Sequence, residues 1–446
     1  MSSFFAKANY TFDNRYLLEG TVRRDGSSRF GPGNKFGVFP SIGAGWNIHE
    51  EAFMKSTKNF LNEFKLRMSY GSLGNENIGL YKYQTLINAG NGNETVFGNP
   101  DITWETVHML DVGADIRLFK NLTVTFDYYN KLTTDMIITP PISYIGGISA
   151  APLNSGKVRN KGWEFDVSYN KQVTKDFGLN IHAGLTHNEN KIEDLFGAPY
   201  DNGNRIHQIG YALNSYYIYP TDGLLQEDDF TKDASGKWVP KEDVVIFDGQ
   251  EPGDIHYLDT NGDGKITTDD RTYLGSSNPK VFGGFGSTLY WKGLMANLTF
   301  TYSLGGKRYW QQESASMAPN VYNAPDFIMD NWTLAGPDAK YPNVSLYGYG
   351  ENGVFTDRWL HNASYLRLSA LNISYRLPQK WFKNKVIQGV EANFQATNLF
   401  TITPYPGMDP QGNFSTSNLA LQGYGYDSSS YPTARTINIG LKFTFK

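Results

Sequence analysis

A twelve-residue stretch, Asp259 to Asp270, has the residue types and the spacing of a calcium-binding loop. Oxygen-bearing side chains stand at loop positions 1, 3 and 5, and a glycine at position 6 allows a sharp turn. Position 7 offers a backbone carbonyl, and position 12 is a carboxylate. Calcium takes about six to eight oxygen ligands in proteins. The pattern therefore predicts a calcium site formed by Asp259, Asn261, Asp263, the Lys265 carbonyl and Asp270.

Two features weaken this prediction. Position 12 is aspartate, and its shorter side chain makes bidentate ligation harder than glutamate would. The flanks 253–258 and 271–275 also lack the helical periodicity that surrounds an EF-hand loop. A turn held by side-chain hydrogen bonds without metal therefore remains an open alternative. If calcium binds, we expect a weak site that orders a loop and takes no part in catalysis.

Residues for other kinds of chemistry are sparse. The chain has no cysteine, and its seven histidines show no HExxH motif or paired ligand spacing. The glycine run 283–286 lacks the strand-then-helix context and the lysine of a phosphate-binding loop. The net charge of −4 comes without a basic stripe, which argues against nucleic-acid binding. We expect no enzymatic activity.

The elements that must position the loop are predicted to be β-strands. In the last stretch, 433–445, apolar and polar residues alternate strictly, with Ile437, Leu441 and Phe445 in the apolar phase. About thirteen stretches of this kind follow one another, beginning with 4–12. No stretch approaches the roughly 18 consecutive apolar residues of a membrane-spanning helix. A content of 15% aromatic residues and 46 glycines also favours strands joined by turns.

The predicted connections alternate between short and long. The short ones fall at 13–14, 50–61, 120–121, 171–177, 292–293 and 378–387, and the long ones at 25–35, 71–101, 131–156, 193–280, 305–363 and 404–432. Outer-membrane barrels have short periplasmic turns and long extracellular loops. The pattern predicts an all-β, antiparallel transmembrane barrel segment, with 193–280 and 305–363 as extracellular insertions. A soluble β-sandwich or propeller is the alternative, because both also contain amphipathic strands.

Several motifs, in this order along the chain, resemble one family. They are the stretches 16–31 (YLLEGTVRRDGSSRFG), 66–75 (LRMSYGSLGN), 160–164 (NKGWE), 259–271, 364–368 (SYLRL) and 396–400 (ATNLF). The chain resembles the SusC/RagA-type TonB-dependent transporters of the Bacteroidetes outer membrane. The resemblance covers residues 1–446 as the C-terminal part of a 22-stranded barrel and includes no plug domain.

The resemblance implies a location, a function and partners. The barrel would lie in the outer-membrane lipid and import oligosaccharide or peptide nutrients. A SusD-like surface lipoprotein would cover it, and the TonB complex would act through the N-terminal part, which these residues do not include. A passive outer-membrane pore and a surface glycan-binding β protein are the alternatives.

Aromatic residues in the predicted loops are ambiguous. Their flat apolar faces could stack on sugar rings, or they could pack the loops against each other. The residues concerned are Tyr216, Tyr217, Trp310, Trp332, Tyr347 and Trp359. The sequence does not assign any of them to a ligand.

Overall fold

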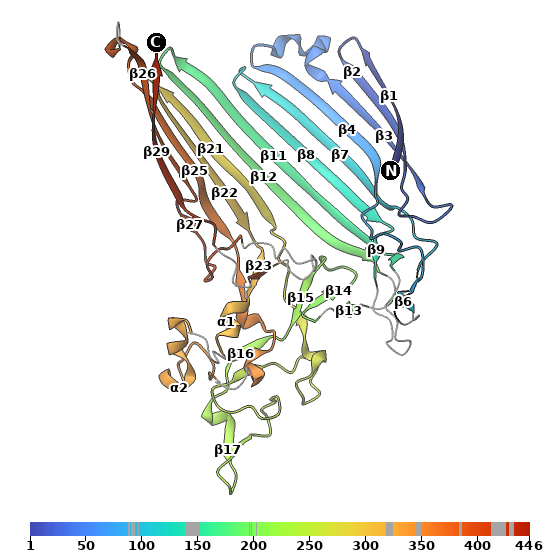
Figure 1. The fold of residues 1–446 in the computed structure, drawn as a ribbon, viewed down its shortest axis with the longest axis vertical. Coiled ribbons are helices and arrows are strands. Elements are labelled where there is room, and N and C mark those ends of the chain that lie inside the picture. Colours follow the sequence, from blue (N-terminus) through green and yellow to red (C-terminus); the bar gives the residue numbers. More distant parts are fainter. Residues whose placement is uncertain are drawn as a thin grey trace.

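The structure is a computed structural model. One large antiparallel sheet makes up most of it. The structure describes residues 1–446 except 88–89, 91–93, 97, 140–151, 196, 198, 202, 318–323, 345–349, 383–385, 412–424 and 428–431. Within these residues, thirteen strands follow each other in chain order across the sheet (Figure 1). They are β1 (Ser2–Phe12), β2 (Tyr16–Gly26), β3 (Phe36–Asn47), β4 (Leu61–Asn75), β7 (Glu105–Leu118), β8 (Leu122–Thr134), β11 (Lys157–Thr174), β12 (Phe177–Asp194), β21 (Val281–Trp291), β22 (Leu294–Leu304), β25 (Tyr365–Arg376), β26 (Ile387–Thr397) and β29 (Thr436–Phe445). The predicted number of strands is confirmed.

The register gives the sheet one apolar and one polar face. Met68 pairs with Val112, and the same apolar phase continues across the sheet through Phe126 and Phe165. Residues one position away occupy the polar phase, as in the pairs of Gly43 with Ser69, Gly184 with Asp166, and Gln395 with Asn438. Because strand side chains alternate, a shift of one residue would exchange the two faces. The phase is kept from strand to strand.

The apolar face is largely uncovered. Met68 is 52% exposed and Phe126 is 42% exposed, although both lie within the sheet. Monomeric soluble proteins rarely leave a contiguous apolar surface of this extent open to water. An apolar band facing lipid is the usual outer surface of a membrane barrel. The exposure of this face therefore favours the membrane interpretation over a soluble sandwich, whose apolar face would be covered.

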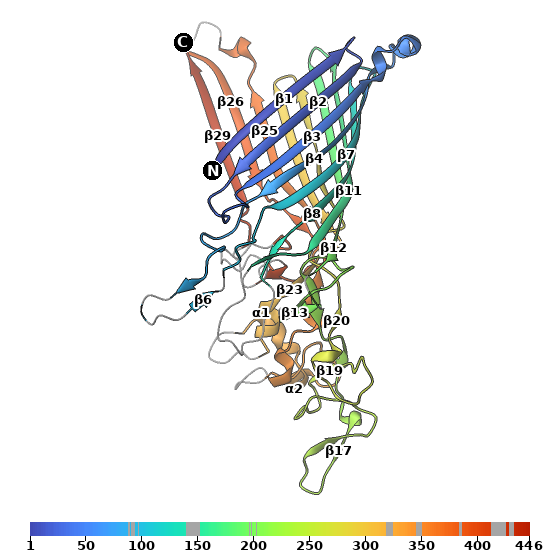
Figure 2. The ribbon, with the colours of Figure 1, turned by 90° about the vertical axis from the view of Figure 1, so that its right-hand side faces the viewer.

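Short and long connections lie at opposite ends of the sheet (Figure 1). In the described part of the chain, six short connections join β1–β2, β3–β4, β7–β8, β11–β12, β21–β22 and β25–β26. The β3–β4 connection contains the short 3-10 helices η1 (Ile48–Glu50) and η2 (Ala52–Thr57), where the sequence predicts one or two helical turns. The long connections extend from the other end, and Figure 2 shows 195–280 reaching furthest from the sheet. The predicted alternation is confirmed.

Several strands are longer than the alternation of apolar and polar residues in the sequence predicts. β4 continues to Asn75, although the sequence places a loop from residue 71, and β12 continues to Asp194. The closing strand, by contrast, begins at Thr436 and not at Thr433. On β11 and β12 the extensions carry charge mainly in the phase that is apolar further along the strands, with Lys161 bonded to Glu189. The apolar and polar alternation disappears there, so hydrophobic periodicity gives no signal for the strand ends.

Two of the sequence motifs, 364–368 and 396–400, are neighbours in the structure through one irregular strand pairing. Asn398 adopts the left-handed conformation, with φ of 50°. The turn lets the chain continue as β27 (Thr401–Ile402), which pairs with β25 after β26 has ended. The backbone N–H of Leu368 donates to the carbonyl of Phe400 at 3.1 Å. Residues 364–368 and 396–400 therefore shape the exit from the sheet.

The long connections contain small secondary elements of their own. Those in the first half are β5 (Leu86–Ile87), β6 (Glu94–Val96), β9 (Ile137–Ile138) and β10 (Leu153–Asn154). Those in 195–280 are β13 (Tyr200–Asp201), β14 (Arg205–His207), β15 (Ser215–Ile218), β16 (Thr221–Leu224), η4 (Glu227–Asp229), β17 (Phe230–Lys232), β18 (Trp238–Pro240), β19 (Ile255–Tyr257), η5 (Thr268–Asp270) and β20 (Thr272–Tyr273). The rest are β23 (Lys307–Trp310), α1 (Gln311–Ala315), η6 (Asp326–Asp330), α2 (Trp332–Ala335), η7 (Gly350–Gly353), η8 (Asp357–Trp359), β24 (Leu360–Asn362), η9 (Gln379–Trp381) and β28 (Tyr426–Asp427). In the described residues, no helix has the length and apolar character to cross a bilayer.

Candidate functional site

An arginine on the polar face of the sheet contacts carboxylates from two neighbouring strands. Arg67 on β4 donates to Asp115 at 3.2 Å and to Asp111 at 3.3 Å, both on β7. It also donates to Asp127 on β8 at 2.6 Å. Gly113 makes room, because a Cβ there would lie 2.6 Å from the Arg67 guanidinium carbon. These contacts fix the register of three strands. Three carboxylates face one guanidinium, so this part of the polar face carries excess negative charge.

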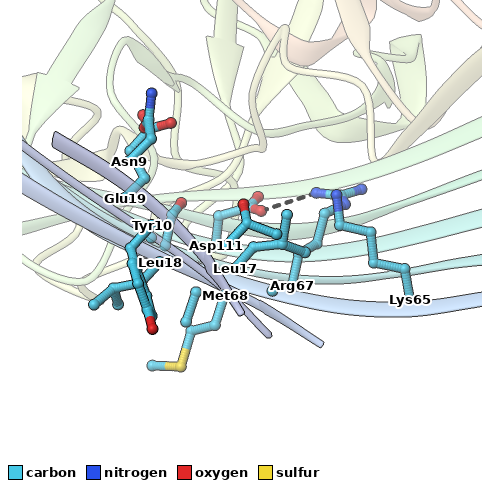
Figure 3. A pocket seen from close by; sticks show the side chains of 14 residues that line it. Asn9, Tyr10, Leu17, Leu18, Glu19, Lys65, Arg67, Met68 and Asp111 are labelled. Carbon is cyan, nitrogen blue, oxygen red and sulfur yellow. Dashed lines mark hydrogen bonds and ion pairs between the residues drawn. The ribbon is translucent and has the colours of Figure 1, made fainter. Parts of the chain in front are cut away.

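A shallow depression adjoins this arginine. It has a volume of about 410 Å³, and Gly43 and Gly45 are among its lining residues, together with Glu19, Lys65 and Arg67. Figure 3 shows Tyr10, Leu18 and Met68 on the opposite side of the sheet from Asn9 and Glu19. The polar wall is therefore grooved where glycines replace side chains. Glu19, Lys65 and Arg67 give this face its charge, and Leu17 is an apolar residue beside them.

The connections 195–280 and 305–364, called the loop module from here on, share a hydrophobic core. Its buried members are Tyr216, Ile218, Tyr219, Ile255, Tyr257, Ile266, Tyr309, Met317, Tyr341, Trp359 and Leu360. Trp359 is 1% exposed and stacks on Tyr341 at 6.4 Å between ring centroids. The Tyr216 hydroxyl donates to the carbonyl of Gly425 at 2.7 Å. The two insertions therefore form one packed body at the end of the sheet.

Burial decides three of the six ambiguous aromatic residues. Trp359 and Tyr216 are fully buried and Trp310 is 9% exposed, so these three pack the loop module and are not available to stack on a sugar. Tyr217 and Trp332 are partly exposed. Tyr347 lies outside the described residues. Sequence reasoning missed the shared core, although the aromatic patch 211–219 was a signal for it.

A buried polar cluster joins helix α1 to strand β24. Glu313 is 2% exposed and accepts a hydrogen bond from the Tyr341 hydroxyl at 2.9 Å. Its other oxygen contacts His361 Nε2. Burial raises the pKa of Tyr341, with a further contribution from Glu313. The tyrosine therefore stays a neutral donor, and the cluster stabilises the loop module. Among the seven histidines, His361 is thus accounted for by packing.

The predicted calcium loop is held by hydrogen bonds to its own backbone. Asp259 accepts from the N–H groups of Gly262 at 2.6 Å and Gly264 at 2.8 Å. Asn261 accepts from Asp263 N at 2.8 Å, and Asp263 in turn accepts from Lys265 N at 2.9 Å. These are side-chain turns of the kind that aspartate and asparagine form. The glycine at position 6 has φ of 78°, as a sharp turn requires.

Asp270 closes the loop from inside the module. It is fully buried, and its two oxygens accept from Thr260 N at 2.9 Å and Thr267 N at 2.7 Å. Burial raises the pKa of this carboxyl, but the backbone donors outweigh burial and the net pKa is lowered. Asp270 is therefore a charged anchor whose oxygens already have partners. Ile266 is also buried in the core of the module.

The residues fit calcium in part. The oxygens of Asp259, Asn261 and Asp263 keep lone pairs beyond their backbone hydrogen bonds, which is the donor chemistry that calcium prefers. In the described part of the chain, however, no three His, Asp or Glu side chains converge on a common point. Calcium would thus depend on Asn261, the Lys265 carbonyl and water, with Asp270 shaping the loop. The calcium site remains a prediction.

Removal of the exposed carboxylates tests this site. In the whole receptor, Asp259→Ala with Asp263→Ala should abolish calcium-dependent protection of the loop from limited proteolysis, with a wild-type Kd of order 10⁻⁴ to 10⁻³ M. The control, Asp228→Ala with Glu242→Ala, removes two carboxylates from the same insertion and should retain the calcium effect. If the loop is protected from protease equally in wild type and in the first variant across the calcium titration, these carboxylates do not bind calcium.

Comparison with known proteins identifies the family. Residues 1–399 match the family described as "TonB dependent receptor-like, beta-barrel". The chain therefore belongs to the β-barrel of TonB-dependent receptors, which are proteins of the outer membrane. "TonB-dependent receptor P3" of Formosa agariphila is 32% identical over 99% of this chain and 45% of its own length. "TonB-dependent receptor SusC" of Bacteroides thetaiotaomicron is 29% identical, over 99% of this chain and 43% of its own.

Solved structures agree with this assignment. One chain of the "RagAB peptide transporter" has 26% sequence identity and a TM-score of 0.78, covering 99% of this chain and 47% of that chain. The "closed-closed" state of the RagAB peptide importer gives 0.79 at 27% identity. The residues are therefore a SusC-like barrel segment, as their motifs predict. They span about half the length of the relatives that they match.

Proposed function

We propose that this chain forms the C-terminal wall of a barrel that imports oligosaccharide or peptide nutrients across the outer membrane. The observation that carries the proposal is the likeness to the RagAB peptide transporter over 99% of the chain. The polar face would line the lumen, and the groove near Arg67 would contribute to the wall along which solute passes. The apolar face would meet lipid.

The orientation follows from the connections. Long loops are extracellular and short turns periplasmic in bacterial barrels. The loop module would then lie outside the cell at the mouth of the lumen, where a SusD-like surface lipoprotein would cover it. The RagAB structures support such a partner, because that importer is described in both "closed-closed" and "open-open" states, as a barrel with a lid would be. The TonB complex would act through the N-terminal part of the receptor.

An uptake assay tests energised import. Cells carrying the whole receptor should accumulate labelled oligosaccharides or peptides, and an uncoupler of the proton-motive force should stop the accumulation. Cells without the receptor should not accumulate the label. Both solute classes are supplied, because only the names of the solved relatives favour peptide. Uptake that continues unchanged with the uncoupler would contradict the proposal and favour a passive pore.

A further inference from the structure

The connection between β3 and β4, residues 48–60, is the longest of the six short connections. It starts beside Trp46, which pairs with Tyr16 in the apolar phase of the sheet. The two rings stack with 6.5 Å between their centroids. Figure 2 shows the connection as the coiled blue segment at the upper right, which projects outward on the side opposite both chain ends. The connection therefore lies on the outer, apolar side of the sheet.

A buried carboxylate holds the connection against that face. Glu51 is 8% exposed, and one of its oxygens accepts from the Tyr16 hydroxyl at 2.6 Å and from Trp46 Nε1 at 3.0 Å. The other oxygen accepts from Arg15 Nη1 at 3.1 Å. These donors, the Tyr16 hydroxyl first among them, lower the pKa of Glu51, so the carboxylate stays charged at neutral pH. A buried charge needs such partners, and here all three come from β2, β3 and the turn before β2.

Beyond Glu51, the connection exposes an aromatic ring close to positive charge. Phe53 on η2 is 65% exposed, and Lys55 is exposed two residues later. At the end of the connection, Phe60 is 46% exposed and lies 6.5 Å from Phe119 of the β7–β8 turn, between ring centroids. Membrane-surface segments combine apolar side chains that enter lipid with lysines that meet the headgroups. The exposed side of the connection has this composition.

The apolar face of the sheet continues on both sides of the connection. Trp46 on β3 pairs with Leu66 on β4 and with Tyr16 on β2. These three side chains are 37–45% exposed. In a membrane barrel this face meets lipid, and its aromatic side chains lie at the level of the headgroups. Because Phe53 is two residues from the carboxylate that binds this aromatic row, lipid is the partner that its surroundings fit.

We propose that the β3–β4 connection is a membrane-surface anchor that inserts Phe53 into the phospholipid leaflet at the short-turn end. The Phe53 ring lies below the headgroups, and Lys55 lies among their phosphates. Glu51 is a positioning residue, because it holds the connection against Tyr16 and Trp46. The proposal rests on the contact of the apolar face with lipid in the proposed function, and it does not depend on import.

Spin-label accessibility in the whole receptor tests this anchor. A nitroxide is attached to single cysteines in a receptor without other cysteines, which is then reconstituted into vesicles of phosphatidylethanolamine and phosphatidylglycerol. Oxygen concentrates in lipid and a nickel chelate stays in water, so the ratio of their collision rates reports depth. In Phe53→Cys the nitroxide takes the place of the ring, and the ratio should be severalfold above that of Asp176→Cys in the β11–β12 turn. Met68→Cys, on the apolar face of β4, is the lipid-facing reference and should give a high ratio.

The reference positions separate failure of the anchor from failure of the membrane embedding. A low ratio at position 53 with a high ratio at position 68 would overturn the anchor alone. Low ratios at both positions would overturn the embedding on which the anchor rests. Exclusion of both reagents from position 53 would mean that protein, such as a second copy of the receptor, covers this site, and this result would also overturn the anchor.

Removal of the carboxylate tests its positioning role. Glu51→Ala should lower the ratio at position 53 towards the value at position 176, because the connection is released from Tyr16 and Trp46. The control, Glu50→Ala, removes the neighbouring exposed carboxylate and should leave the ratio as in wild type. Heat-modifiable migration shows whether each barrel is folded, and Glu51→Gln should lower the ratio in part if the alanine variant does not fold. An unchanged ratio in a folded Glu51 variant would overturn the role of this residue.

Discussion

Replacing Trp359 with alanine in the whole receptor should unfold the loop module while the sheet remains in the membrane. The indole is 1% exposed and stacks on Tyr341 within the core that the two insertions share. Truncation of a buried tryptophan costs about 3–5 kcal/mol, because it removes apolar contacts and leaves a cavity. Trp359 lies among core residues from both insertions, so its loss loosens the contact between them. We expect rapid proteolysis within 195–280 and 305–364.

A second tryptophan of the same module serves as the control. Trp238 lies in the distal β17–β18 hairpin and is only partly buried, so Trp238→Ala should leave the protease pattern nearly unchanged. Heat-modifiable migration of both variants should match wild type, since neither residue belongs to the sheet. If Trp359→Ala resists protease like wild type, the insertions do not depend on a common core and behave as separate loops.

The largest effect expected within the sheet comes from charge on its apolar face. Phe126 lies in the middle of the apolar phase of β8 and pairs with Phe165 on β11. A lysine on the lipid face near the bilayer midplane destabilises a barrel by about 2–4 kcal/mol. Phe126→Lys should therefore reduce the amount of folded receptor in the outer membrane and lower the denaturant concentration at which the barrel unfolds.

The adjacent residue gives a matched control. Thr125 points to the polar face, where its hydroxyl lies 3.4 Å from Asp115. A lysine in this position meets carboxylates and water, so Thr125→Lys should fold nearly as well as wild type. Equal loss of folded receptor in both variants would contradict the assignment of the faces.

The sheet could be predicted from the sequence because the lipid bilayer imposes a simple rule. Each spanning strand needs apolar residues at every second position, and this period alone identifies Met68, Phe126 and Leu441 as members of one face. The order of strands then follows from the short turns. The rule ends where the bilayer ends, and for that reason the extensions of β4, β11 and β12 were not predicted.

The loop module could not be predicted from periodicity, because its elements are short and irregular. Its core is formed by residues far apart in the chain, such as Tyr216 and Trp359, which become neighbours only after both insertions have folded. The candidate calcium loop is the opposite case. Its side chains contact backbone a few residues away, so the local turn could be predicted, whereas the burial of Asp270 depends on the folded module around it.

Labelling of single cysteines on intact cells tests the central claim most directly, because the described barrel segment has no cysteine of its own. Ser235→Cys lies in the connection between β17 and β18, and Asp176→Cys lies in the short turn between β11 and β12. A membrane-impermeant maleimide should label position 235 on intact cells and position 176 only after the outer membrane is permeabilised. Labelling of position 176 on intact cells, with position 235 protected, would contradict the orientation and the importer built on it.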